Sequence, residues 1–156
     1  MPGFEKAELN GYVDYLYIRD YDRYETKYVL DYPDLKSSRM FWDNVTLGSY
    51  AIDLQGTRAL PLGMGFGKPD RYGIPLRSFL LKSYDNVIVV GKSVGTTIKA
   101  YGSARIMATT AMAAQSIGII LGRETKQNKH LSELTQADFK RIHKYLAKDY
   151  KLVVDK

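Results

Sequence analysis

The clearest pattern of apolar positions lies between residues 86 and 122. Residues 87–90 are four β-branched apolar residues in a row. Such a run, with no polar alternation, is typical of a strand that is buried on both faces inside a sheet. Gly91 ends the run, and a turn rich in glycine, serine and threonine follows it. An uncharged segment then extends to Leu121, so we predict a long buried helix with Ser103 as its N-cap.

Upstream of this stretch the pattern predicts a β-rich region. A short helix is expected at residues 34–40, and the segment 55–71, rich in glycine and proline, is expected to be a long loop. Within the segment 25–32, which is expected to be a strand, Tyr28 and Leu30 should share one face while Val29 lies on the other. The segments with strand-like alternation and β-branched or aromatic residues are 12–18, 25–32, 45–54 and 72–81.

The last part of the chain has the pattern of an amphipathic helix. Thr135 and Asp138 form a variant of the capping box, with aspartate in place of glutamate. We therefore predict a helix over residues 136–148, with His143 at its surface. Two leucines just before the cap, Leu131 and Leu134, are expected to pack on the helix start. Apolar residues recur at helical spacing at Phe139, Ile142, Tyr145 and Leu146.

Composition excludes several kinds of chemistry. The 156 residues are enough for about one domain, and they include no cysteine and two histidines. Disulfides, thiolate metal sites and thiol nucleophiles are therefore excluded, and we expect no metal centre. No signal peptide is visible at the N-terminus, and the lack of cysteine is compatible with the cytoplasm. The uncharged segment 106–122 is just short of a membrane-spanning length, so we expect a buried helix and no membrane partner.

The net charge of +6 raises the question of a nucleic-acid partner. Basic residues are scattered along the chain, apart from a group after residue 125 that also contains acidic residues. A solvated helix face explains that group better than a nucleic-acid patch does. Residues 12–32 are rich in tyrosine, which is typical of a half-exposed sheet. The alternative interpretation is that these rings stack on nucleic-acid bases. We therefore expect no nucleic-acid partner.

A strand, a glycine-rich turn and a helix start can form a site for an anionic or electron-rich ligand. The same pattern also occurs in a βα unit that binds nothing, and spacing alone leaves both alternatives open. Two more specific nucleotide-binding motifs are incomplete in this sequence. The sequence GKS at 91–93 resembles the end of a P-loop, but Asn86 stands where that loop needs glycine. The sequence GMGFG at 63–67 follows Pro61 and precedes Pro69, so it lacks the strand and helix of a dinucleotide fingerprint.

Several strings, in order along the chain, resemble the C-terminal part of a family of FAD-dependent oxidoreductases. The family pattern has a Y-x-I-P-x-R segment, a strand ending in glycine, a G-S-x-R-V-M helix start and a G-Q-A-A-G helix body. The strings in this sequence are YIRD at 17–20, DNVTLGSYAID at 43–53, YGIPLRSFL at 72–80, NVIVVG at 86–91, GSARIM at 102–107 and QSIG at 115–118.

The resemblance implies an α/β fold with a mixture of substrate-side strands and helices. It would be the C-terminal part of a two-domain, Rossmann-type flavoprotein, with a substrate-side region at 1–71, a segment of the FAD-binding domain at 72–122 and a helical extension at 123–156. It implies FAD as the cofactor and a small-molecule substrate, and it places Arg77 and Asp53 on the substrate side. The cofactor-binding residues that it implies are Gly91, Lys92, Ser93, Gly102, Ser103, Ala104, Arg105 and Ile106.

Some family features are missing from the sequence. Family members begin with a strand, G-x-G-x-x-G and a helix that hold the ADP half of FAD, and the 156 residues contain no such unit. The resemblance thus implies an N-terminal half of the same flavoenzyme, or a partner chain, and names no catalytic acid or base. The alternative is a catalytically degenerate binding module that self-associates or needs a partner. Departures from the family pattern at Gln55, Lys92, Ile98 and Lys99 favour that alternative, and further departures occur at Ala114, Ser116 and Ile117.

Overall fold

A computed structural model gives the fold of residues 3, 5–8, 11, 14–15, 22–54, 64–65 and 69–155. This part of the chain mixes helices with short antiparallel strands, which confirms the α/β mixture; the two-domain Rossmann-type arrangement stays a prediction. The strands are β1 (Asn44–Gly48), β2 (Asp53–Leu54), β3 (Met64–Gly65) and β4 (Tyr72–Pro75). The α-helices are α1 (Tyr32–Lys36), α2 (Ile98–Ala104), α3 (Met107–Thr125) and α4 (Gln136–Tyr150). Three short 3-10 turns are η1 (Leu76–Ser78), η2 (Gly91–Ser93) and η3 (Leu131–Glu133).

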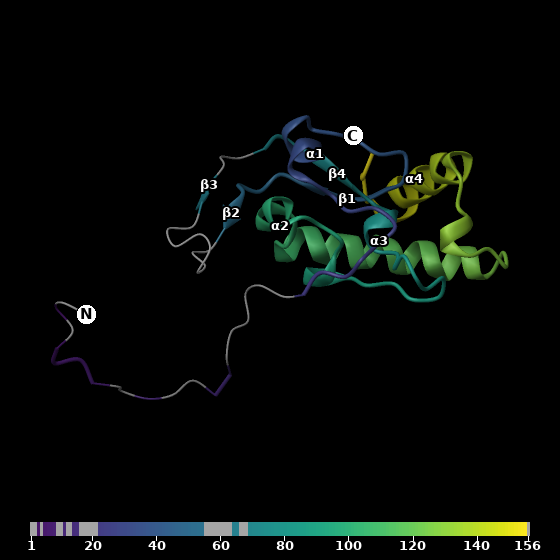
Figure 1. Ribbon diagram of the computed structural model, residues 1–156. Helices are drawn as coiled ribbons and strands as arrows, with labels where there is room; N and C mark the ends of the chain where they lie inside the picture. Colours follow the sequence, from purple (N-terminus) through teal and green to yellow (C-terminus); the bar gives the residue numbers. More distant parts are fainter. Residues whose placement is uncertain are drawn as a thin grey trace.

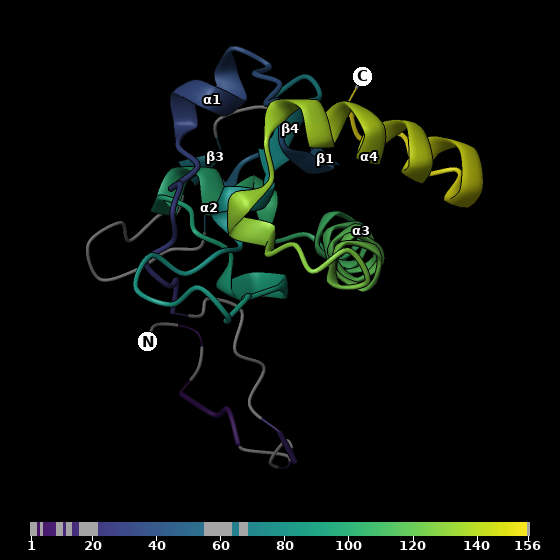
Figure 2. The ribbon, with the colours of Figure 1, turned by 90° about the vertical axis from the view of Figure 1, so that its right-hand side faces the viewer.

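Helix α3 runs beneath the β1–β4 sheet, with α2 near its first turn and α4 toward its other end (Figure 1). Figure 2 looks along α3 and shows that α4 crosses above it. A direct bond ties the sheet to α3, because the Thr46 hydroxyl donates to the Thr109 carbonyl oxygen at 3.0 Å. The two strands therefore sit over the beginning of the long helix.

Strands β1 and β4 pair antiparallel, and Gly48 faces Tyr72 across the pair. A Cβ atom on Gly48 would lie closer than 3.0 Å to the Tyr72 ring. The glycine is therefore needed here, because its missing side chain leaves the room that the tyrosine ring occupies. The register shift of the pair lies away from this glycine, between Asn44 and Thr46.

The expected strands are shorter than their apolar patterns. The segment 45–54 splits into β1 and β2, and 72–81 ends as a strand at Pro75, where η1 begins. Within 25–32 the pairing consists of single bridges at Thr26 and Leu30. The face pattern there is confirmed, since Leu30 is fully buried and Val29 is exposed. The expected strand at 12–18 lies largely outside the described residues, as does most of the loop 55–71, in which β3 pairs with β2.

The expectation of a buried central strand at 86–91 was wrong. Its pairing is one antiparallel bridge, between Ile88 and Leu80. Val87 is 38% exposed and Val90 is 44% exposed. A β-branched run is buried on both faces only where other layers cover it. In the described part of the chain none of these four residues is fully covered, since Ile88 and Val89 are only partly buried.

The predicted single helix is two helices. α2 ends at Ala104, α3 begins at Met107, and their axes are bent by 86° at the junction. Ser103 is therefore not an N-cap but a fully buried residue inside α2. The break falls at Ile106, which has extended backbone angles (φ −65°, ψ 138°). Within the described residues, no single helix is long and apolar enough to cross a membrane; α2 and α3 meet that test only as a bent pair.

The two terminal helices begin with side-chain caps. At α1, which starts two residues earlier than expected, the Asp31 carboxylate accepts the Tyr32 N–H at 2.7 Å. The predicted capping box of α4 is confirmed, because Thr135 Oγ1 accepts the Asp138 N–H at 3.3 Å and Asp138 accepts the Thr135 N–H at 2.9 Å. α4 runs two residues past its predicted end, to Tyr150.

Helix α4 belongs to the main core. Leu131 and Leu134 are buried beside its start, as expected. Phe139 is fully buried and meets the Trp42 ring edge-on, with the ring centroids 5.5 Å apart. The expectation that His143 lies at the surface was wrong: its side chain is 9% exposed, and Nε2–H donates to the Asn44 carbonyl oxygen at 2.9 Å. One hydrophobic cluster thus includes residues from each of the segments 1–71, 72–122 and 123–156.

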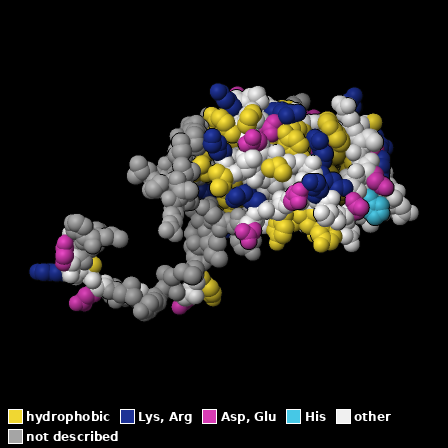
Figure 3. Space-filling model, in the orientation of Figure 1, with side chains coloured by type: hydrophobic (Ala, Val, Ile, Leu, Met, Phe, Trp, Pro, Cys, Tyr) yellow, Lys and Arg dark blue, Asp and Glu magenta, His cyan; other side chains and the backbone are white. Residues whose placement is uncertain are grey.

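The charged side chains are interspersed on the surface. On the face drawn in Figure 3, basic and acidic groups alternate with apolar ones and form no single basic field. On α4 the exposed basic residues follow helical spacing, at Lys140, Lys144 and Lys148. This arrangement is that of a solvated helix face.

Candidate functional site

A cavity of about 530 Å³ opens where the end of β1 meets the start of α3. Its volume lies within the range of roughly 300–1,000 Å³ that small-molecule sites occupy. Apolar side chains and three hydroxyls form its walls, and no charged side chain is among the described residues that line it. These residues are Leu47, Ser49, Tyr50, Ala51, Ile106, Ala108, Thr109 and Met112.

The first turn of α3 borders this cavity, and its N–H groups are not capped by a side chain. Ile106 is the N-cap residue and provides no side-chain cap. The first bond of the helix ladder runs from the Thr110 N–H to the Ile106 carbonyl oxygen at 2.9 Å. The N–H groups of residues 107–109 therefore have no partner within the helix, and the positive end of the helix dipole lies with them. Met107 is 84% exposed, so this helix start is open to solvent.

Two buried hydroxyls hold the opposite wall of the cavity. Ser103 Oγ donates to the Tyr50 carbonyl oxygen at 2.6 Å. The Tyr72 hydroxyl lies 2.7 Å from the same Ser103 oxygen. Burial raises the pKa of Tyr72 to about 12, although its hydrogen bond with Ser103 lowers it somewhat. Tyr72 is therefore protonated throughout the ordinary pH range.

The predicted cofactor residues fall into two groups. Gly91, Lys92 and Ser93 form η2, which packs against α3. Gly91 has φ +77°, which favours glycine, and nothing lies within 4 Å of the position that a Cβ would take. Gly102, Ser103 and Ala104 lie in the buried last turn of α2. Of the residues that were predicted, only Ile106 is among the described residues that line the cavity.

Arg105 lies at the corner between α2 and α3, where its side chain is 8% exposed. Nη2 donates to the Asp53 carbonyl oxygen at 3.1 Å and lies 3.7 Å from Asp53 Oδ2. Nε has no hydrogen-bond partner in the described part of the chain. A Cβ on the nearby Gly102 would lie 3.0 Å from the same Asp53 oxygen, so this glycine allows α2 to approach β2 closely. Arg105 and Gly102 thus join the helix corner to β2.

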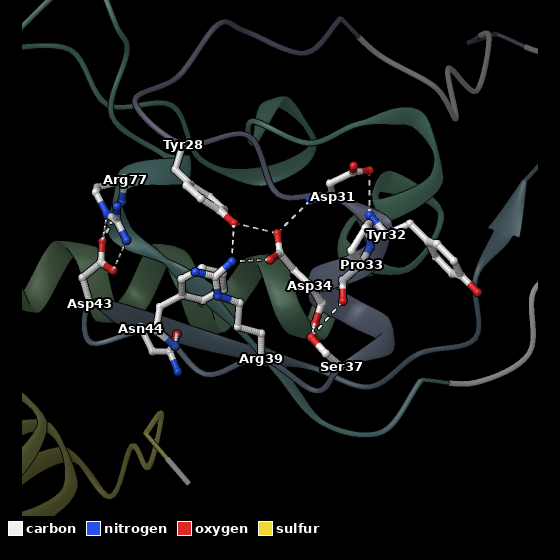
Figure 4. Close-up of polar contacts among 11 residues, drawn as sticks. Tyr28, Asp31, Tyr32, Pro33, Asp34, Ser37, Arg39, Asp43, Asn44 and Arg77 are labelled. Carbon is white, nitrogen blue, oxygen red and sulfur yellow. Dashed lines mark hydrogen bonds and ion pairs between the residues drawn. The ribbon is translucent and has the colours of Figure 1, made fainter.

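Arg77, expected on the substrate side, forms an ion pair with a buried carboxylate of this chain. Its Nε and Nη2 bind the two carboxylate oxygens of Asp43 at 2.9 and 3.1 Å (Figure 4). Asp43 is 1% exposed, and the guanidinium lies 5.3 Å from the ring centroids of Tyr28 and Trp42. Neither Arg77 nor Asp53 is among the described residues that line the cavity. Their role toward a substrate stays a prediction.

A second polar network lies beside this pair. The Tyr28 hydroxyl donates to Asp34 at 2.7 Å, and Arg39 binds the other oxygen of the same carboxylate at 2.9 Å (Figure 4). Burial, reinforced by Asp34, raises the pKa of Tyr28 to about 12. Asp34 also accepts the Asp31 N–H at 3.1 Å, so the network fixes the start of α1. It is a structural network, and none of its residues is among the described residues that line the cavity.

Most of the cavity residues were not singled out by sequence reasoning. Ser49, Tyr50 and Ala51 lie within the string DNVTLGSYAID, which did carry the resemblance. Ala108, Thr109 and Met112 follow the predicted helix start by a few positions, because that start was placed too early. No group of three or more metal-ligating side chains occurs among the residues that the structure describes.

This geometry is suited to a largely apolar ligand with an electron-rich edge that faces the helix start. Comparison with known proteins makes this more specific. The family model of the FAD dependent oxidoreductases matches residues 1–146, which is most of the chain. The chain therefore belongs to the FAD-dependent oxidoreductase family, and family membership implies FAD as the cofactor. No curated protein and no solved structure gives a significant match.

Proposed function

We propose that this chain supplies the flavin-facing part of an FAD-dependent oxidoreductase, with the cavity between β1 and α3 as the site of the flavin ring. One observation carries the proposal: the uncapped first turn of α3 opens onto a cavity of about 530 Å³ that has apolar walls. When bound, the flavin supplies the redox chemistry, and the protein supplies its binding and orientation.

The residues that are present fit a flavin ring. Leu47, Ile106 and Met112 offer apolar surface to the faces of a flat aromatic system. The N–H groups of residues 107–109 offer donors to its electron-rich edge, where they stabilise negative charge that gathers there. No carboxylate among the described lining residues opposes that charge. Gly91, at φ +77° with open space around it, leaves room for a ligand to approach the backbone of η2.

The remainder of the cofactor needs further structure. The sequence contains no strand–G-x-G-x-x-G–helix unit for the ADP half of FAD. We propose that an N-terminal half of the same flavoenzyme, or a partner chain, supplies that unit. The substrate would be a small molecule, and Arg105 would act on the site by holding the α2–α3 corner through Asp53.

Met107→Pro is expected to weaken binding of riboflavin about 3- to 10-fold. Proline at the first helical position removes one N–H donor but keeps the helix. Ile106 is already extended (φ −65°, ψ 138°), as the residue before a proline prefers. The loss of one hydrogen bond, of the order of 0.5–1.5 kcal/mol, gives the expected change in the dissociation constant. Riboflavin is the probe because it carries the ring without the ADP half.

The matched control is Met107→Ala, which shortens the same exposed side chain but keeps the N–H group. Its dissociation constant for riboflavin, measured by fluorescence quenching on the full 156-residue chain, should stay within about twofold of that of the unchanged protein. Equal affinity of the proline and alanine variants would remove the α3 start from the flavin site.

Ala108→Glu is expected to weaken the binding of reduced riboflavin about tenfold more than that of oxidised riboflavin. Ala108 lines the cavity and is exposed, so the new carboxylate lies beside the edge that carries negative charge after reduction. An acidic residue in the first turn also stabilises a helix by about 0.3–1 kcal/mol, so the fold should be kept. The ratio of the two dissociation constants, measured anaerobically, tests this.

The control is Ala108→Gln, which has nearly the same shape and no charge. It should change the two dissociation constants by the same factor. A ratio that is equal in the glutamate and glutamine variants would contradict a flavin edge at this helix start.

A second candidate function is a binding module that has lost the catalysis. The exposure of Val87 and Val90 favours it, because these apolar side chains suit a covering partner. The departures from the family pattern at Lys92 and Lys99 favour it as well. In the riboflavin experiment, an unchanged chain that self-associates and binds no flavin would support this reading. A strictly monomeric chain that binds riboflavin would contradict it.

A further inference from the structure

Ser103 has an unusual environment for a helical serine. Serine hydroxyls inside helices commonly bond back to a carbonyl one turn earlier in the same helix. Ser103 instead reaches a segment 53 residues away, at Tyr50, and its side chain is fully buried. Its hydroxyl therefore connects α2 to the chain between β1 and β2, which is a wall of the cavity.

The direction of the two bonds follows from the atoms. A carbonyl oxygen only accepts, so Ser103 must donate its single hydroxyl hydrogen to Tyr50. The Ser103 oxygen must then accept from the Tyr72 hydroxyl, 2.7 Å away, which must donate. The result is a one-way relay that runs from Tyr72 through Ser103 to the carbonyl of Tyr50.

The relay depends on the β1–β4 pair. Tyr72 faces Gly48 across the strands, and a Cβ at Gly48 would collide with the Tyr72 ring. Tyr72 therefore crosses β1 where there is no side chain, and its hydroxyl reaches Ser103 in the helix. β1 and β4 thus place the Tyr72 hydroxyl against Ser103, and Ser103 alone bonds to the Tyr50 carbonyl.

We propose that Ser103 is a positioning residue for the flavin cavity. Its bond to the Tyr50 carbonyl oxygen holds residues 49–51 in place as a wall of the cavity and keeps that oxygen directed toward the protein interior, away from the ligand. The inference rests on the proposed function. With the Tyr50 carbonyl oxygen engaged, the polar side-chain groups among the described lining residues are the hydroxyls of Ser49, Tyr50 and Thr109, next to the N–H groups at the start of α3. The wall therefore suits an electron-rich ligand edge. If the Tyr50 carbonyl turned outward, the partial negative charge on its oxygen would repel that edge.

The test compares Ser103→Ala with Tyr72→Phe in the full chain. Loss of the serine hydroxyl should raise amide hydrogen exchange at residues 49–52 at least about tenfold, while exchange at 45–47 stays unchanged. It should also weaken riboflavin binding about tenfold. Tyr72→Phe keeps the bond between Ser103 and Tyr50, so both effects should be clearly smaller.

Ser116→Ala is the matched control. Ser116 is also a fully buried helical serine, but its hydroxyl has no hydrogen-bond partner in the described part of the chain. Its loss should change neither the exchange at 49–52 nor the affinity for riboflavin. A hydroxyl that only stabilises the fold would lower the Tm without changing the dissociation constant of the folded protein, and that result at Ser103 would overturn the proposal.

Two further outcomes separate this inference from the proposed function. Unchanged exchange at 49–52 in Ser103→Ala would overturn the positioning role, whatever the chain binds. If the unchanged chain binds no riboflavin but Ser103→Ala shows the expected exchange, the role of Ser103 in holding the wall stands. The assignment of the cavity to a flavin then fails.

Discussion

Arg77→Met is expected to lower the free energy of unfolding by about 3 kcal/mol, which corresponds to a fall in Tm of about 10 °C. The reason lies in Asp43, which is 1% exposed and receives two hydrogen bonds from the Arg77 side chain. Removal of the guanidinium leaves a buried carboxylate without its partner, and this costs more than the pair itself contributes. Methionine keeps much of the apolar contact with Tyr28 and Trp42. Urea unfolding at neutral pH measures the change.

The double variant Arg77→Met/Asp43→Asn is the control, because it removes both charges. It should be more stable than Arg77→Met alone, since the uncompensated charge is gone. A loss below about 1 kcal/mol in Arg77→Met would contradict this view and would place the pair among exposed salt bridges, whose contribution is small. Arg77 would then again be a candidate for binding an external carboxylate.

Phe139→Ala is expected to lower the free energy of unfolding by about 3–5 kcal/mol. Phe139 is fully buried, and its ring contacts Trp42 and His143 edge-on, with centroids 5.5 and 5.4 Å away. Truncation would leave a cavity between α4 and the segment before β1. The chain has one tryptophan, so the fluorescence of Trp42 reports this contact directly, and it should change in the folded variant.

Lys140→Ala provides the matched control, one residue further along the same helix and exposed to solvent. It should stay within about 0.5 kcal/mol of the unchanged protein and keep the same tryptophan emission. If Phe139→Ala were equally mild, residues 123–156 would be an appendage and would not contribute to the core.

Local rules predicted those elements whose signals lie within a few residues. The start of α4 follows from Thr135 and Asp138, which are three residues apart, and its buried face follows from the spacing of Phe139, Ile142 and Leu146. The strings at 43–53, 72–80 and 102–107 gave the family. The cavity itself was not predicted, because it forms between two distant segments, residues 47–51 and residues 106–112.

The errors share one cause, which is that long-range contacts compete with local preference. Ser103 has the chemistry of an N-cap, but its hydroxyl bonds to Tyr50 from inside α2, and the helix start moves to Met107. The sequence pattern of α4 predicts a surface position for His143, but its ring nitrogen bonds to the Asn44 carbonyl oxygen, which buries the side chain. Residues 87–90 have the composition of a buried strand, but burial depends on which layers cover them.

The sequence by itself therefore determined the family, the mixture of helices and strands, the capped C-terminal helix and the absence of thiol chemistry. Each of these depends on residue type or on spacing within one element. Tertiary structure alone decided the 86° corner between α2 and α3, the cavity beneath it, and the pairing of Arg77 with Asp43. The Arg77–Asp43 pair joins residues 34 positions apart, and the bond from Ser103 to the cavity wall joins residues 53 positions apart, so no local pattern specifies which of them meet.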